Sequence, residues 1–226
     1  MTERDNKPVD LVIFDCDWEL VDSELLAAEV LAREVSVEGL PLTADECLAR
    51  YTGISMKSVL ALIEAERGRA LPPDFEARVR AGDFAAFAAS LQPVAGVREM
   101  LQALPHRRCV ASSGWPDKMR FTLGRTGLLP LLAPHLFSAS MVAHGKPAPD
   151  LFLHAARMMQ ADPAACVVIE DAVAGIIAAR AAGMRVLGFA GASHCGDGYR
   201  AMLEGAGASI VFSRMDQLVE LLKQVR

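Results

Sequence analysis

Three features that would assign this sequence of 226 residues to a specialised class of protein are missing. No apolar run approaches the roughly 20 residues that a membrane-spanning helix requires. The first ten residues are polar and mixed in charge, which is unlike a signal peptide. No stripe of Lys and Arg appears, and the net charge is -5, so a nucleic-acid footprint is not expected. We therefore expect a cytoplasmic protein that binds neither membrane nor nucleic acid.

Paired cysteine motifs are also missing. The five cysteines form no C-x-x-C pair, and three of them lie in apolar, strand-like runs. Buried, reduced thiols are the expectation for such a pattern. Cys16, which directly follows the apolar run at 11–14, is expected to act as a small buried hydrophobe and not as a catalytic thiol.

What the sequence does contain is an alternation of short apolar runs with segments of helical periodicity. Hydrophobic residues make up 52% of the chain, enough for a substantial core. Strands alternating with helices predict an α/β fold, with a parallel sheet and helices on both of its faces. The predicted strands are 10–14, 109–112, 166–169, 185–189 and 209–212, and the predicted helices are 23–35, 97–104, 117–126, 150–159, 172–182 and 215–225.

One long segment interrupts this alternation. Residues 25–91 are rich in Ala, Leu, Glu and Arg and contain no convincing strand, which predicts an inserted all-helical domain. The segment 92–96 is the expected return to the core. We place the core at 1–21 and 94–226 and the helical cap at 22–93. The small-residue segment 190–199 is expected to be a loop.

Polar side chains follow several of the predicted strands at their carboxyl ends, where open parallel sheets bind their ligands. The first predicted strand is followed by two acids, the second ends in serines, and a third is followed by two more acids. A lysine precedes one of the helices. These segments can converge on one crevice, and the residues concerned are Asp15, Asp17, Ser112, Ser113, Lys146, Glu170 and Asp171.

Several acids in one crevice repel one another, and burying them is costly unless they are paired. A hard divalent cation such as Mg²⁺ resolves this conflict, with Asp15 and Asp171 as its natural carboxylate ligands. Lys146 adds a fixed positive charge for an anion. Asp15 is best placed to act as a nucleophile on a phosphate and Asp17 to transfer the proton, while Ser112 can donate to a phosphoryl oxygen.

Four segments carry a resemblance to a known family. FDCDWELVDSE (14–24), ASSGWPDK (111–118), GKPAPD (145–150) and VVIEDAVAG (167–175) resemble the motifs of haloacid-dehalogenase superfamily phosphatases, in the group that includes phosphoglycolate phosphatase and β-phosphoglucomutase. They occur in the family's order with family-like spacing, and the resemblance covers nearly the whole chain.

The resemblance implies a Rossmann-like core, a helical cap and magnesium as the cofactor. It implies that Asp15 is the nucleophile, and that Asp17 is both the general acid/base and a metal ligand through its carbonyl. Asp171 is implied as a further metal ligand, with Glu170 beside it in the metal-binding set. Ser112, Ser113 and Lys146 are implied to hold the phosphate, and Lys146 is counted with the catalytic residues.

The cap segment YTGISMKSV (51–59) lies where relatives place substrate-contacting residues, which makes Gly53, Ser55 and Lys57 candidate substrate contacts. A simpler interpretation is a helix start, with Ser55 as its N-cap and Lys57 in solvent. Both interpretations are kept open.

The sequence departs from the family at two adjacent positions. Trp18 and Glu19 stand where relatives usually have glycine and then a small or β-branched residue. Glycine permits backbone angles that cost other residues roughly 1 kcal/mol or more. We expect the Trp18 indole to point toward the cap or the entrance, and Glu19 to add negative charge near an anionic substrate. Together they are expected to weaken activity without changing the set of metal ligands.

The predicted function is a magnesium-dependent phosphatase that hydrolyses a small phosphorylated metabolite, of the sugar phosphate or phosphoglycolate type, through an aspartyl-phosphate. One alternative is a β-phosphoglucomutase, although the arginine and histidine that such mutases carry in the cap are replaced here by Met56 and Ala27. The other alternative is an impaired, phosphate-binding relative in which Trp18 blocks the site. A monomer or weak homodimer is expected.

Overall fold

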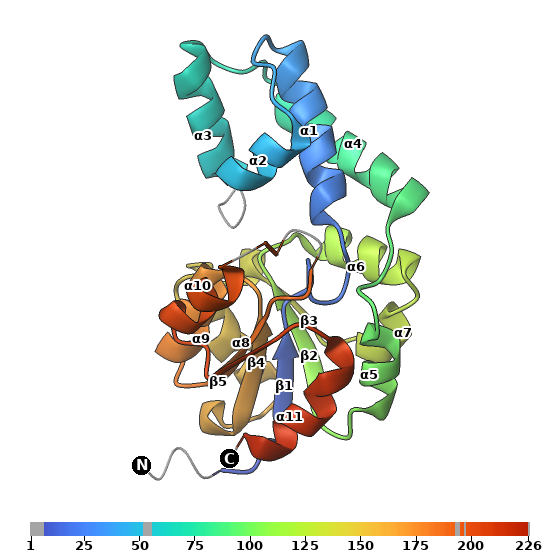
Figure 1. The fold of residues 1–226 in the computed structure, drawn as a ribbon, viewed down its shortest axis with the longest axis vertical. Coiled ribbons are helices and arrows are strands. Elements are labelled where there is room, and N and C mark those ends of the chain that lie inside the picture. Colours follow the sequence, from blue (N-terminus) through green and yellow to red (C-terminus); the bar gives the residue numbers. More distant parts are fainter. Residues whose placement is uncertain (1–6, 52–55, 193–194, 197, 226) are drawn as a thin grey trace. The chain divides into compact units, whose positions relative to one another are not determined.

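The computed structural model describes residues 7–51, 56–192, 195–196 and 198–225 (Figure 1). The chain divides into two compact units. The core comprises Met1–Asp22 and Gln92–Arg226, and the cap comprises Ser23–Leu91. The boundaries expected from the sequence lie at 21/22 and 93/94 instead, within the short segments that join the two units.

The core is built on a six-stranded sheet in which every pair of neighbouring strands is parallel. The strand order is β3-β2-β1-β4-β5-β6, which confirms the predicted α/β class. One short strand at the edge, β3, was not expected. The strands are β1 (Leu11–Phe14), β2 (Arg107–Ser112), β3 (Leu136–Ser138), β4 (Cys166–Glu170), β5 (Arg185–Phe189) and β6 (Ile210–Phe212).

Most helices of the core coincide with the segments of helical periodicity. Two helices, α7 and α10, were not expected, and α10 begins at the last residue of the segment expected to be a loop. The helices are α5 (Val97–Ala103), α6 (Pro116–Arg125), α7 (Leu129–Leu132), α8 (Asp150–Met158), α9 (Val173–Ala181), α10 (Tyr199–Ala206) and α11 (Leu218–Gln224).

Both faces of the sheet are buried, as is usual for a parallel sheet. Leu11 and Ile13 of β1 belong to the apolar cluster formed with α8, α9 and α10. The alternate residues Val12 and Phe14 are equally buried but lie outside that cluster. Figure 1 shows α5 and α11 on the other side of the sheet from α8 and α9. Because successive side chains of a strand point to opposite faces, the continuous apolar run LVIF packs against the helices on both faces of the sheet.

The cap has an apolar core of its own, which includes Val35, Ile63 and Phe75. Ion pairs tie its helices together: the guanidinium of Arg67, only 4% exposed, lies 3.0 Å from Glu38. The described part of the cap contains helices and no strand, as expected. Its helices are α1 (Glu24–Val37), α2 (Ala44–Tyr51), α3 (Met56–Arg67) and α4 (Phe75–Ser90).

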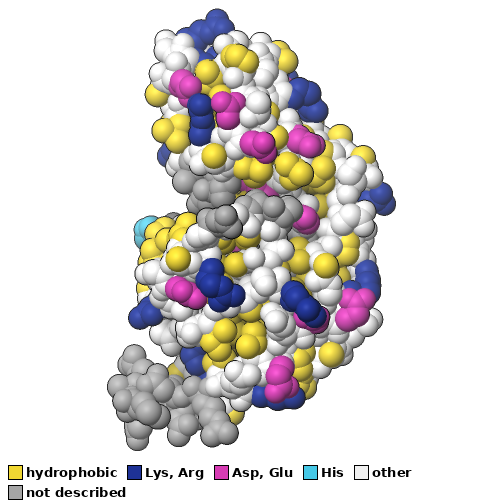
Figure 2. Space-filling model, viewed as in Figure 1, with side chains coloured by type: hydrophobic (Ala, Val, Ile, Leu, Met, Phe, Trp, Pro, Cys, Tyr) yellow, Lys and Arg dark blue, Asp and Glu magenta, His cyan; other side chains and the backbone are white. Residues whose placement is uncertain are grey.

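Charged side chains of both signs are interspersed on the face of the molecule that Figure 2 draws. Figure 2 shows Lys and Arg beside Asp and Glu on the drawn face, where the described residues form no patch of a single sign. Within the described ranges, no helix is both long and apolar enough to cross a membrane.

The cysteines are all free thiols. Cys16 is 1% exposed, and its sulfur lies 3.9 Å from the hydroxyl of Thr122. Burial raises the pKa of this thiol well above its usual value. These properties agree with the expected role of Cys16 as a small buried hydrophobe.

Candidate active site

The register of the sheet brings the predicted catalytic acids to one edge. Phe14 pairs with Ile169 of β4 and with Val110 of β2. Asp15 therefore follows β1 at the level where Glu170 ends β4, and its amide donates to the carbonyl of Ile169 at 3.2 Å. Ser112 ends β2 in the same way. The parallel sheet thus gathers these residues at the carboxyl ends of its central strands.

Lys146 links two of these carboxylates. Its ammonium contacts Asp15 Oδ1 and lies 2.5 Å from Glu170 Oε1. The side chain is 6% exposed. Burial by itself lowers the pKa of Lys146, but the adjoining carboxylates of Asp15 and Glu170 outweigh burial and raise it above the usual value. A charged ammonium therefore stands between the two acids.

Both carboxylate oxygens of Asp15 have polar partners. While Oδ1 faces Lys146, Oδ2 accepts from the amide of Asp17 at 3.1 Å. The residue is 8% exposed. Burial raises the pKa of Asp15 to about 6, with Glu170 and Asp17 adding to the effect and Lys146 opposing it. The carboxyl group is thus fixed in orientation by donors that favour its ionised form.

Asp17 has a cationic partner that sequence reasoning missed. Lys118, within the first turns of α6, donates from its ammonium to Asp17 Oδ2 at 3.0 Å. The two side chains are 27% and 20% exposed. The signal was available, since the segment ASSGWPDK ends on this lysine and the helix it opens follows directly from the end of β2. Lys118 is a positioning residue for the Asp17 carboxylate.

The two serines at the end of β2 differ in their surroundings. Ser112 is 1% exposed, and its hydroxyl oxygen accepts from the amide of Gly114 at 3.0 Å. The carbonyl of Gly114 in turn accepts from Ser138 at 2.7 Å. Ser113, by contrast, is exposed. The buried hydroxyl that accompanies the acids is therefore that of Ser112.

The position of the Glu170 carboxylate requires a glycine at residue 175 in α9. Its Oε2 accepts from the amide of Ala172 at 3.0 Å, while Oε1 faces Lys146. A Cβ atom on Gly175 would lie 1.8 Å from Oε1, far inside van der Waals contact. Gly175 therefore provides the space that the Glu170 carboxylate occupies.

Asp171 completes the acidic group. It is 3% exposed, and its backbone carbonyl accepts from the hydroxyl of Tyr199 at 3.0 Å. Burial raises the pKa of Asp171 well above its usual value, with further contributions from Glu170 and Asp15. Tyr199 is the last residue of the segment that was expected to be a loop, and it opens the unexpected helix α10; its role was missed for that reason.

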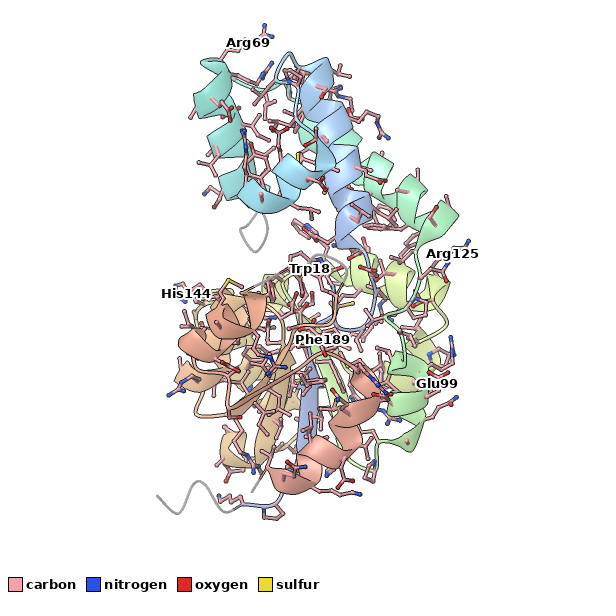
Figure 3. All side chains as sticks on the ribbon, in the orientation of Figure 1. Trp18, Arg69, Glu99, Arg125, His144 and Phe189 are labelled. Carbon is pink, nitrogen blue, oxygen red and sulfur yellow. The ribbon has the colours of Figure 1, made fainter. Side chains whose placement is uncertain are left out.

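The loop after β1 determines the surroundings of Trp18 and Glu19. Trp18 adopts a φ of 77°, the left-handed conformation that suits glycine, and is 5% exposed. Figure 3 shows it beyond the carboxyl end of β1. The amides of Leu20 and Val21 both donate to the carbonyl of Cys16, at 3.2 Å. This tight turn directs Glu19 inward, where it is 0% exposed.

Glu19 joins two of the predicted metal ligands. One oxygen each from Glu19, Glu170 and Asp171 lies within 4.8 Å of the others. Both carboxylate oxygens of Glu19 are buried without a hydrogen-bond partner among the described residues. A cluster of buried carboxylates with such oxygens fits a hard divalent cation, which prefers oxygen ligands. Asp15 and the Asp17 carbonyl would complete the set of oxygens available to it.

The remaining candidates lie elsewhere or outside the described part of the chain. Gly53 and Ser55 fall outside the described residues. Lys57 lies in the first turn of α3 and is exposed. His144 is exposed and takes no part in the site, and its Nδ1 lies 3.2 Å from Asp150.

Comparisons with known proteins agree with this arrangement. The model of the haloacid dehalogenase-like hydrolases matches residues 9–183, so the chain belongs to this family. It is 29% identical to the 6-phosphogluconate phosphatase of Escherichia coli (strain K12), over 95% of each chain. It is 28% identical to a phosphorylated carbohydrates phosphatase of Thermotoga maritima, over 96% of this chain and 100% of that one.

Solved structures extend the likeness to the whole fold. A conserved haloacid dehalogenase-like protein of unknown function from Agrobacterium tumefaciens str. C58 is 38% identical, with a TM-score of 0.85 over 96% of this chain and 98% of that chain. A hydrolase of the same family from Deinococcus radiodurans R1, solved with bound phosphate and sodium, is 31% identical, with a TM-score of 0.79 over 96% of each chain. These matches confirm the expected family and support its expected class, a hydrolase of phosphoric monoesters.

Proposed function

We propose that this chain is a magnesium-dependent phosphatase that acts on a small phosphorylated sugar or sugar acid. The observation that carries the proposal is the fixed Asp15 carboxylate, bonded to the Asp17 amide and the Lys146 ammonium at the carboxyl edge of the sheet. A carboxylate held in one orientation beside a cation is the arrangement that a nucleophile on phosphorus requires.

The residues divide the reaction between them. An oxygen of Asp15 forms a bond to phosphorus as the bond to the ester oxygen breaks, and Asp17 gives that leaving oxygen a proton. Asp17 then takes a proton from the water that attacks the phosphorylated Asp15, which releases inorganic phosphate. Lys146 and Ser112 stabilise the phosphoryl oxygens by positive charge and hydrogen bonding. Lys118 keeps the Asp17 carboxylate in position through the 3.0 Å contact.

A bound Mg²⁺ would be held by Asp15, the Asp17 carbonyl and Asp171, and would supply neutralisation of the charge that develops on the phosphoryl group. The proposal also keeps the expectations of a cytoplasmic monomer or weak homodimer.

The names of several relatives favour a phosphorylated carbohydrate as the substrate. The relatives include the two phosphatases above and a fructose-1-phosphate phosphatase of Escherichia coli, which is 29% identical over 76% of this chain. A phosphoglucomutase is the second candidate, because residues of this chain are 55% identical to a β-phosphoglucomutase of Bacillus subtilis, although only over 47 residues. Met56 and Ala27, which replace the cap cations of such mutases, favour hydrolysis.

Asp15→Asn tests the proposal, with phosphate release measured on a panel of sugar phosphates, with Mg²⁺ and with a chelator. We expect the parent to release phosphate only with the metal, and Asp15→Asn to lose more than about 1,000-fold in turnover. Asp216→Asn, which alters an exposed carboxylate paired with Arg214, is the control and should match the parent. If Asp15→Asn keeps most of the activity, the nucleophile is misassigned. If the parent releases no phosphate from any substrate, the chain is an impaired relative.

A further inference from the structure

Glu19 is a buried acidic residue beside the site to which the proposed mechanism gives no role. It is 0% exposed, and neither of its carboxylate oxygens has a hydrogen-bond partner among the described residues. Leaving a buried carboxylate unpaired costs several kcal/mol in general. A side chain placed at that cost indicates that something outside the described atoms satisfies it.

The surroundings of Glu19 specify the charge of its missing partner. Its nearest acidic neighbours are Glu170 and Asp171, each with an oxygen within 4.8 Å of the others in the cluster. The ammonium of Lys146 is already shared between Asp15 and Glu170. The partner must therefore be an additional positive charge.

We propose that Glu19 is a direct ligand of the divalent cation, an extra carboxylate alongside Asp171 that tightens metal binding before any substrate arrives. The inference deepens the function proposed above, since it concerns the same metal site. The turn at Trp18 is what delivers this ligand, because it directs the next residue into the cluster and not into solvent.

An extra carboxylate ligand should strengthen the binding of some divalent cations more than that of others. Mg²⁺ keeps several water ligands in its octahedral shell, whereas Ca²⁺ accepts six to eight oxygens and readily takes carboxylates through both oxygens. Adding Glu19 to a site that already offers Asp15 and Asp171 therefore favours the larger ion. Removing Glu19 is expected to weaken Ca²⁺ binding more than Mg²⁺ binding.

The test measures metal binding and not turnover. The metal-free parent, Glu19→Gln and Glu19→Val are titrated calorimetrically with Mg²⁺ and with Ca²⁺, without any phosphate ester. Glu19→Gln keeps the size of the side chain and removes its charge. We expect both variants to bind Ca²⁺ about tenfold more weakly or worse, with a smaller loss for Mg²⁺. Glu99→Gln, an exposed change in α5 labelled in Figure 3, is the matched control and should bind as the parent does.

Thermal unfolding of the same proteins provides a second readout. Without metal, Glu19→Gln should melt at a higher temperature than the parent, because the variant no longer buries an uncompensated carboxylate. Added Ca²⁺ should then raise the melting temperature of the parent more than that of the variant. Unchanged affinities in both Glu19 variants would overturn the proposal, as would a parent that binds neither ion. Neither result depends on phosphatase activity, so a failure here is distinct from the failure of Asp15 as a nucleophile.

Discussion

Replacing Gly175 with alanine is expected to damage the site more than any other single-methyl change in the core. The added Cβ would lie 1.8 Å from Oε1, 1.9 Å from Cδ and 2.4 Å from Oε2 of Glu170. Glu170 is 1% exposed, so it cannot simply turn into solvent. It must move, and in moving it loses the contacts with Lys146 and with the Ala172 amide.

The expected cost follows from those contacts. Breaking a buried ion pair typically destabilises a protein by about 3–5 kcal/mol, a large part of a total stability of roughly 5–15 kcal/mol. Gly205→Ala is the matched control, because it lies in α10 with no atom within 4 Å of its added Cβ. As a change to alanine inside a helix, the control should stabilise the protein by about 0.5–1 kcal/mol.

Urea unfolding of the metal-free proteins measures both changes, and a double-mutant cycle identifies the cause. In a Glu170→Ala background the clash no longer exists, so the further change Gly175→Ala should cost little. The reasoning is refuted if Gly175→Ala alone is as stable and as active as Gly205→Ala. The reasoning is also refuted if Gly175→Ala lowers the free energy of unfolding by the same amount with and without the Glu170 side chain.

Two further predictions concern the neighbours of the nucleophile. Lys118→Met should lower kcat about 10-fold to 100-fold with less than about 1 kcal/mol of lost stability, because the lysine orients Asp17 from a partly exposed position. Lys118→Arg should recover part of the rate, and the control Lys223→Met, at an exposed ion pair, should change neither kcat nor stability. Equal kcat values in all three variants would contradict the role of Lys118. Trp18→Gly should lower the free energy of unfolding in urea by about 2 kcal/mol. Losing the buried indole costs about 3–5 kcal/mol, whereas relieving the left-handed backbone gains only about 1–2 kcal/mol. A variant more stable than the parent would show that the backbone strain is the larger effect.

The regular part of the fold could be predicted from the sequence because its signals are local. The run Leu11–Phe14 and the run Arg185–Phe189 are apolar segments between polar breaks. β3 has only three residues, and only two of them, Leu136 and Phe137, are apolar, so no apolar run marks it. α10 was missed because a glycine flanks each of its ends, Gly198 and Gly207, and because it begins at the last residue of a segment with the composition of a loop.

The site was predictable where position along a strand decides the outcome, and not where a loop does. Asp15 and Glu170 come to one edge because parallel strands align their carboxyl ends, a rule that needs no side-chain detail. Glu19 lies inward because of the backbone turn at Trp18, and no local pattern distinguishes a buried carboxylate from one at the entrance. Lys118 ends a family-like segment and could have been named as a candidate, but its contact with Asp17 spans a long sequence separation and could not be read from the sequence.

The way the cap segment leaves and re-enters the core has a consequence for the order of folding. The amide of Asp22 donates to Gln92 at 3.1 Å, and the amide of Val94 donates to Leu20 at 3.1 Å, so the two ends of the insert start from adjacent points. Pairing of β1 with β2 closes a loop of chain that contains the whole insert. Closing an unstructured loop costs about 0.6 kcal/mol more for each doubling of its length. A cap that has already folded around Val35, Ile63 and Phe75 shortens that loop. Folding of the inserted domain therefore lowers the entropic cost of pairing the strands that precede and follow it in sequence.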